Sequence, residues 1–232
     1  MYARFKIVGI GLVIAGVAFM GVGGYTYAKT QQGANALNAF SAAQNVKLSY
    51  NDQGQLTDRG ETEGAAAIMS LLQNDWGYTV DPSELNPNDP VVNTASEYMY
   101  QMATIAHHTL DGTQTVVLPE DVTAADGTVY KAGTYEVPVA GRYWSQFDRT
   151  NPIDAKVREQ AWTGTAHALI AELGVGSVTA SALQMGLGIA ALAAALGAVL
   201  LLAGIGIVWA ARPLTVAETE KAKKPVAATI TA

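Results

Sequence analysis

Two uninterrupted apolar stretches, at residues 7–24 and 187–209, constrain the fold of this chain more than any other feature. Each is close to the ~20 apolar residues that a helix needs to cross the hydrocarbon core of a bilayer. The segment between them is polar enough to fold in water. We therefore expect a mainly α membrane protein, with transmembrane helices at 7–27 and 186–211 in the lipid bilayer and a water-exposed domain at 28–185.

Basic residues gather in the short flanks outside these stretches. Arg4 and Lys6 precede the first stretch, and Arg212 with three lysines follows the second. The middle segment carries 8 basic and 18 acidic residues, a net charge of −10. Positive charge beside a span is retained on the cytoplasmic side. We therefore expect a two-pass protein of the cell membrane, with a cytoplasmic N-terminus at 1–6, a cytoplasmic, disordered tail at 212–232 and an extracytoplasmic domain.

The first stretch has a second interpretation, a cleavable signal peptide. It has a basic start and an apolar run, and Thr26-Tyr27-Ala28 follows as a poor match to a small-x-small cleavage site. We expect a retained signal anchor, and the cleaved form is the alternative.

Small residues recur every seven positions in both apolar stretches. They are Gly9, Gly16 and Gly23 in the first, and Ala190, Gly197 and Gly204 in the second. Helices in lipid associate by close backbone approach through small residues. The spacing therefore predicts helix-packing surfaces, used either between the two spans or with a helix of another membrane protein. The two spans contain no charged residue and no His, which argues against a proton path, channel or transporter.

The middle segment reads as a helical body with one β insertion. Asp89-Pro90 and Asn151-Pro152 each pair a capping residue with a proline at the first helical position. We expect helices at 30–45, 61–74 and 89–110, strands at 46–50, 115–118, 129–131 and 134–139, and a last helix from Asn151 that continues without a stop into the second span. The spans would thus continue into an extracytoplasmic helical bundle with a small β-hairpin or sheet insertion.

Three stretches carry a resemblance to a known group of proteins. They are NTASEYMYQMATIAH at 93–107, GRYWSQFDR at 141–149 and REQAWTG at 158–164. With the flanking spans, the chain resembles an uncharacterised family of actinobacterial two-span membrane proteins. The resemblance implies a span, an external domain with a His-bearing helix and a second span. Some members carry an automatic label as aromatic ring-opening dioxygenases, but that label implies a non-haem iron site of two His and a carboxylate, which we do not expect here.

The chain has three histidines, which are the candidate metal ligands: His107, His108 and His167. Neighbouring residues on a helix point about 100° apart, so His107 and His108 are poorly placed to share one ion. We expect His108 to pair with Asp111 and His107 to be partly buried. His167, with Glu97 or Glu172 as a carboxylate, would have to converge on them to hold Zn²⁺ or Cu²⁺. Our prediction is therefore no metal and no cofactor.

Other reactive patterns are missing from the sequence. It has no cysteine, no Gly-x-Ser-x-Gly, no Ser-x-x-Lys and no phosphate-binding glycine loop. The loop at 81–89 offers oxygen ligands for Ca²⁺, but it lacks EF-hand order and its residues also suit turns and caps. The acidic middle segment argues against nucleic acid as a partner. We expect a protein that is not an enzyme.

Aromatic residues are the remaining signal in the middle segment: Trp76, Tyr78, Tyr98, Tyr100, Tyr143, Trp144, Phe147 and Trp162. As core they would bury large areas and stabilise a domain that has no disulfide. Tyr, Trp and Arg are also enriched in contact surfaces. The candidate contact surface comprises Arg142, Tyr143, Trp144 and Trp162.

Two classes of function follow from these patterns. The first is a non-enzymatic accessory subunit or scaffold component of a cell-envelope or membrane assembly, docked through its small-residue helix faces. The alternative is an extracytoplasmic module that binds or senses a small molecule, lipid or ion in a pocket with His107 or His167 at its floor.

Overall fold

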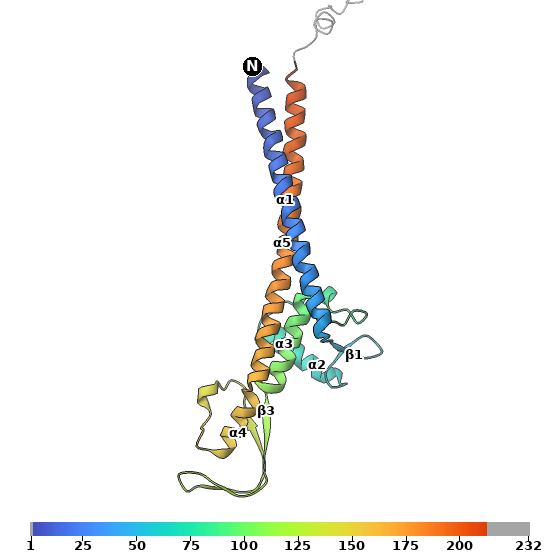
Figure 1. Ribbon diagram of the computed structural model, residues 1–232. Coiled ribbons are helices and arrows are strands. Elements are labelled where there is room, and N and C mark those ends of the chain that lie inside the picture. Colours follow the sequence, from blue (N-terminus) through green and yellow to red (C-terminus); the bar gives the residue numbers. More distant parts are fainter. Residues whose placement is uncertain (1, 213–232) are drawn as a thin grey trace, which may run out of the picture. The chain divides into compact units, whose positions relative to one another are not determined.

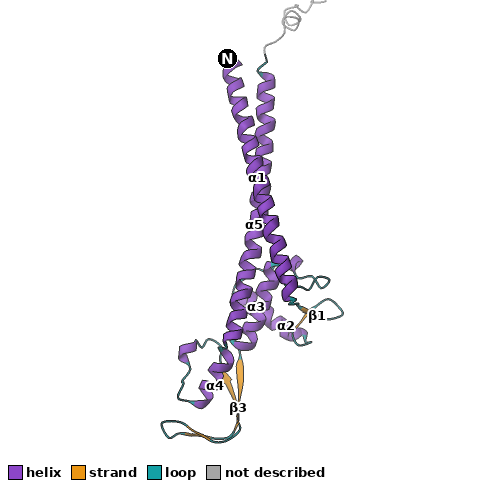
Figure 2. Ribbon diagram, in the orientation of Figure 1, coloured by secondary structure: helices purple, strands orange, loops and turns teal. Residues whose placement is uncertain are grey.

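The computed structural model describes residues 2–212. The tail predicted to be disordered therefore lies, from Pro213 onwards, outside the described residues. Within the described residues the chain forms two compact units, one of residues 2–32 with 185–212 and one of Gly33–Gln184. Two long helices, α1 (Tyr2–Gln44) and α5 (Gly164–Ala210), contribute residues to both units. The fold is mainly helical, with a few short strands (Figures 1 and 2).

The first unit consists of the apolar parts of α1 and α5. Both helices are long and apolar enough to cross a membrane, which confirms the two predicted spans as helices of that kind. Most of their large side chains are exposed, for example Ile14, Val199 and Leu202. Apolar side chains all round a helix suit lipid as the surrounding solvent.

The second unit has a helical core. Its other helices are α2 (Thr62–Ser70), which continues into a π-helical turn at Leu71–Asp75, and α3 (Ala95–Thr109); a 3₁₀ turn occupies Pro82–Glu84. Buried side chains from α2, its π-helical turn, α3, α5 and the segments between them form one cluster, and α1 packs against it through the partly buried Leu37. Its fully or nearly buried members include Ile68, Leu72, Val92, Tyr98, Tyr100, Ala103, Leu173 and Ala180.

The predicted β insertion is present in the second unit as short antiparallel pairs. Strand β1 (Ser49–Tyr50) pairs with β2 (Leu56–Thr57), β3 (Thr113–Leu118) with β6 (Gly133–Pro138), and β4 (Val122–Thr123) with β5 (Val129–Tyr130). After β6 the chain forms a 3₁₀ turn at Trp144–Gln146 and then α4 (Pro152–Ala161). The β3–β6 pair packs against α4 through a second cluster of buried side chains. It contains Val116, Leu118, Val139, Phe147, Val157 and Ala161.

The predicted start of the helix at Asp89-Pro90 is wrong, because α3 begins at Ala95. Residues just before it are extended: the Val92 amide donates to the Val46 carbonyl at 2.9 Å, and the Leu48 amide to the Pro90 carbonyl at the same distance. The cap is Thr94, whose hydroxyl accepts from the Glu97 amide while the Glu97 carboxylate accepts from the Thr94 amide. This reciprocal capping box satisfies two free amides at the helix start.

The predicted uninterrupted helix from Asn151 into the second span is also wrong. Asn151 does cap α4, accepting from the amides of Ile153 and Asp154. However, α4 ends at Ala161, and Trp162 leaves the helical region at φ −112° and ψ 47°. The Thr163 hydroxyl then accepts from the Ala166 amide at 3.0 Å and starts α5. A threonine cap thus restarts the helix, with Gly164 as its first residue.

Candidate functional site

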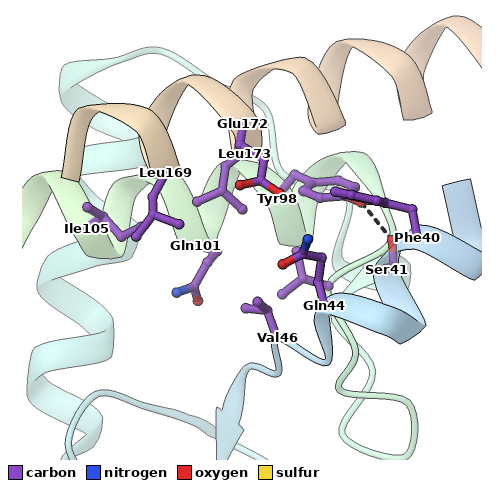
Figure 3. A pocket seen from close by; sticks show the side chains of 11 residues that line it. Phe40, Ser41, Gln44, Val46, Tyr98, Gln101, Ile105, Leu169, Glu172 and Leu173 are labelled. Atoms are coloured by element: carbon purple, nitrogen blue, oxygen red, sulfur yellow. Dashed lines mark hydrogen bonds between the residues drawn. The ribbon is translucent and has the colours of Figure 1, made fainter. Parts of the chain in front are cut away.

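An apolar pocket of about 130 Å³ lies between three helices of the second unit (Figure 3). The end of α1, the middle of α3 and the early part of α5 line it, together with the extended residues Val46 and Val92. Its helical lining is Phe40, Ser41 and Gln44 from α1, Tyr98, Gln101 and Ile105 from α3, and Leu169, Glu172 and Leu173 from α5.

A buried hydrogen bond fixes one wall of the pocket. The oxygens of Ser41 and Tyr98 lie 2.7 Å apart, and the Ser41 hydroxyl donates to the Leu37 carbonyl at 2.9 Å. Since the serine proton is used on Leu37, the Tyr98 hydroxyl donates to Ser41. Gly176 of α5 lies against the Tyr98 ring, where a Cβ would come within 2.5 Å of the tyrosine Cε1. The ring is therefore held on two sides and gives the pocket a rigid wall.

The mouth of the pocket combines polar heads with exposed apolar surface. The side chains of Gln44, Gln101 and Glu172 have no hydrogen-bond or ion-pair partner within residues 2–212. Phe40 and Leu169 are 45% and 41% exposed although both are large and apolar. An apolar interior with a few free polar groups is the usual composition of a small-molecule site.

The histidines lie elsewhere, so the expected pocket with His107 or His167 at its floor is not the one found. The prediction that His108 pairs with Asp111 is wrong. His108 Nε2 lies 2.9 Å from Asp58 Oδ1, next to the start of α2. His107 is the residue beside Asp111, with Nδ1 3.4 Å from Oδ2 and without hydrogen-bond geometry. One helical turn separates residues i and i+4, which is why His107 reaches Asp111.

His167 belongs to a separate aromatic cluster. Its ring stacks on Trp162 at 4.5 Å between centroids, and its Nδ1 donates to the Thr163 carbonyl at 3.0 Å. The other ring nitrogen, Nε2, is buried and has no partner in the part of the chain described. Across the described residues, no group of three or more His, Asp or Glu side chains is arranged to hold a metal ion.

The oxygen-rich loop at 81–89 uses its side chains as local caps. The Asp81 carboxylate accepts from the Ser83 amide at 2.9 Å, and Asn86 accepts from the Asn88 amide at 3.0 Å. Glu84 reaches α3, where one carboxylate oxygen accepts from the Ser96 amide at 2.7 Å. Turn and cap chemistry thus accounts for these residues.

Glu97 is the one carboxylate in the core of the described residues, with 2% of its surface exposed. Burial raises its pKa, and the amides of Asn93 and Thr94 oppose that shift by donating to the charged carboxylate. The pKa of Tyr100, in the same core, is raised by burial as well. Both groups act in the packing and capping of α3 and lie outside the lining of the pocket.

The eight aromatic residues divide between core and surface. Tyr98, Tyr100 and Phe147 are buried, whereas Tyr143 is 63% exposed and Trp144 is 41% exposed. The guanidinium groups of Arg149 and Arg158 lie over the Trp144 ring, at 4.6 and 4.2 Å from its centroid.

The other two members of the candidate contact surface are less free. Arg142 forms a bidentate pair with Asp154, and these hydrogen bonds lower the pKa of Asp154. The Arg142 guanidinium also lies over the Phe147 ring. Trp162 is half-buried and meets Tyr143 edge to face at 5.1 Å. Within the candidate contact surface, Tyr143 and Trp144 therefore supply most of the exposed aromatic area.

The structure brings the small residues of the two spans together within the first unit. A Cβ on Gly16 would lie 2.8 Å from the Gly197 carbonyl oxygen, and one on Gly9 would lie 2.9 Å from that of Gly204. Gly23 is equally close to the Ala190 carbonyl oxygen, at 2.9 Å. Each predicted position on one helix thus faces a predicted position on the other.

Sequence reasoning missed the pocket. Its walls come from residues more than 120 positions apart, and only Tyr98 and Glu172 stood among the residues singled out beforehand, in other roles. The available signal was the large apolar Phe40 and Leu169 on helical segments expected to be water-exposed. No protein-family model, curated protein or solved structure matches this chain. The resemblance to the actinobacterial family therefore stays a prediction.

Proposed function

We propose that this chain is a non-enzymatic, two-span protein of the cell membrane whose extracytoplasmic domain binds a small amphipathic molecule. The observation that carries the proposal is the pocket, because it joins apolar walls to side chains whose polar groups have no protein partner among the described residues. Gln101 is half-buried and gains most from a ligand because no protein group satisfies it, whereas Gln44 and Glu172 are exposed and water hydrates them in the free protein. Both termini would lie in the cytoplasm, as the flanking basic residues predict.

The packing of the spans favours this function over docking through the small-residue faces. The face of α1 that carries Gly9, Gly16 and Gly23 is already covered by α5. A Cβ added at any of these positions would lie closer to α5 than side-chain carbons normally do. A partner helix could not use the same seam without separating the two helices. The small-residue faces are thus better explained as the packing interface between α1 and α5.

The topology is tested by cysteine labelling, which the chain suits because it has no native cysteine. Gln53→Cys places a thiol in the exposed turn between β1 and β2, and Ala222→Cys places one in the C-terminal tail. A membrane-impermeant maleimide added to intact cells is expected to label Gln53→Cys only. Labelling of Ala222→Cys in intact cells would overturn the proposed orientation.

Ligand binding is tested on the full chain in lipid nanodiscs with three probes of one chain length: hexanol, hexanoate and hexylammonium. Gln44→Trp places a large ring at the mouth of the pocket, and Gln73→Trp is the matched control on an exposed turn that does not line it. Partitioning of the probes into lipid is common to all variants. Saturation-transfer NMR should show binding that Gln44→Trp abolishes and Gln73→Trp keeps; equal signals from both variants would refute the pocket.

The second candidate function is the accessory or scaffold role in an envelope or membrane assembly. The exposed Tyr143 and the arginine-flanked Trp144 favour it, since aromatic and Arg side chains are typical of contact surfaces. The test is cross-linking in cells followed by mass spectrometry. Tyr143→Ala with Trp144→Ala should remove a membrane-protein partner that Trp76→Ala, at another exposed tryptophan, keeps; an unchanged partner would count against this surface.

A further inference from the structure

We infer that the ligand of the pocket is an amphipathic organic cation, with an ammonium group at the mouth and an alkyl or similar apolar body inside. The inference deepens the proposed function and rests on it. Three properties of the lining carry it: the charge at the mouth, the polar and aromatic groups beside that charge, and the shape of the apolar wall.

The charge at the mouth is negative. Glu172 is the one charged residue among the eleven that line the pocket, and no Lys, Arg or His is among them. Its carboxylate forms no ion pair or hydrogen bond with any residue from 2 to 212. A ligand anion would be repelled there, whereas an ammonium group would form a charge-assisted hydrogen bond. The net charge of −10 between the spans also enriches cations near the whole domain.

The other polar and aromatic residues that line the pocket suit an ammonium group. Gln44 and Gln101 can each turn a carbonyl oxygen towards N–H donors, because neither amide is engaged by another described residue. Phe40 and Tyr98 line the same pocket with their rings (Figure 3). A cation over an aromatic face is attracted by the quadrupole of the ring, and such faces recur in sites for alkylated ammonium ions.

The rest of the lining is aliphatic and accepts the body of the ligand. Ile105, Leu169 and Leu173 line the pocket from α3 and α5, and Val46 and Val92 complete its aliphatic lining. The space of about 130 Å³ equals the volume of about four water molecules at ~30 Å³ each, so a short alkyl chain fills it and the ammonium group stays at the mouth. A short alkylammonium ion therefore fits, and a complete two-chain lipid does not.

The experiment measures dissociation constants for hexylammonium, hexanoate and hexanol by titration calorimetry, on the full chain in nanodiscs of zwitterionic lipid. Glu172→Gln removes the charge at the mouth and keeps the shape of the side chain. Glu159→Gln is the matched control, an exposed carboxylate on α4 that does not line the pocket. Neither position has a described partner to lose, so both variants are expected to fold.

Hexylammonium is expected to bind at least about tenfold more tightly than hexanoate, a ratio that corresponds to one strong charge contact. Glu172→Gln should weaken hexylammonium about fivefold or more and leave hexanol unchanged, while Glu159→Gln changes neither. If hexanol binds in a way that Gln44→Trp abolishes, but hexylammonium has no advantage or does not respond to Glu172→Gln, the cation inference fails and the proposed function stands. If none of the three probes binds in a way that Gln44→Trp abolishes, both fail.

Discussion

Gly16 and Gly197 exclude each other's side chains. A Cβ on Gly16 would lie 2.8 Å from the Gly197 carbonyl oxygen, and a Cβ on Gly197 would lie 2.8 Å from that of Gly16. Each contact is shorter than a side-chain carbon tolerates, and the obstacle is backbone, which cannot rotate away. The two helices therefore approach as closely as they do only because both positions lack a Cβ.

Replacement of either glycine should separate the helices. We expect Gly16→Leu to lower the free energy of unfolding by about 1–3 kcal/mol, the usual range for overpacking a close contact. The measurement is unfolding in mixed detergent and SDS, followed by circular dichroism. Gly11→Leu is the control on the same helix, since nothing lies within 4 Å of its Cβ position. Equal losses in the two variants would show that the seam does not depend on Gly16.

Gly176 has the same role beside the pocket, but its neighbour is a side chain. A Cβ there would come within 2.5 Å of the Tyr98 ring, which the bond to Ser41 holds in place. Gly176→Ala should therefore destabilise the second unit by about 1–3 kcal/mol in spite of the higher helix propensity of alanine. Gly164→Ala, with nothing within 4 Å, should be neutral or slightly stabilising in the same thermal denaturation.

A second readout separates strain from loss of the pocket. If Tyr98 moves to admit the new methyl group, binding of the hexyl probes should weaken in Gly176→Ala and stay unchanged in Gly164→Ala. A stable Gly176→Ala protein with unchanged probe affinity would mean that the ring has room that its contacts do not show.

Periodic features of the sequence predicted the helices and the small-residue seam, because they depend on local spacing. The seven-residue repeat through Gly9, Gly16 and Gly23 implies one helix face whatever the rest of the chain does. The insertion between Thr113 and Pro138 was likewise visible from alternation and turn residues, although the short β4 strand was not.

The start of α3 was predictable in principle and was misjudged. Two cap signals lie close together, Asp89-Pro90 and the Thr94-x-x-Glu97 capping box. The chain uses the second signal because residues 90–92 form backbone hydrogen bonds with residues 46–48. A helix that began at Pro90 would lose these hydrogen bonds. That pairing joins segments more than 40 positions apart, and such contacts carry no local signature. The pocket was beyond prediction for the same reason, since Phe40, Tyr98 and Leu173 meet only in the folded chain.

Thr94→Ala tests which cap operates. It removes the hydroxyl that accepts from the Glu97 amide at 3.3 Å and donates to the buried Glu97 carboxylate at 2.9 Å. We expect a loss of about 1 kcal/mol of unfolding free energy, within the 0.5–2 kcal/mol typical of N-caps. Asp89→Ala is the control at the rejected cap and should change stability by less than that. A larger loss from Asp89→Ala would place the cap at the start first predicted.

The Arg142–Asp154 pair predicts how stability depends on pH. The contact is bidentate: Arg142 Nη1 and Nη2 donate to the two Asp154 oxygens at 3.1 and 2.7 Å, with both side chains largely shielded from water. This hydrogen bonding lowers the pKa of Asp154 below its ordinary 3.8. A lowered pKa in the folded state means that the stabilisation is present above pH 3.8 and is lost as the pH falls through the folded-state pKa.

Arg142→Met should therefore cost stability near neutral pH and less in acid. We expect a loss of about 1–3 kcal/mol near neutral pH, typical of hydrogen bonds to charged groups, because Asp154 then keeps its charge without its partner. The loss should shrink below pH 3.8, where Asp154 is protonated in the unfolded chain. Lys131→Met breaks the exposed pair with Asp121 and serves as the control, since water and salt already screen that pair. Urea titrations at stepwise lower pH give the comparison, and a loss in Arg142→Met that is constant with pH would assign the role of Arg142 to its packing on Phe147 instead.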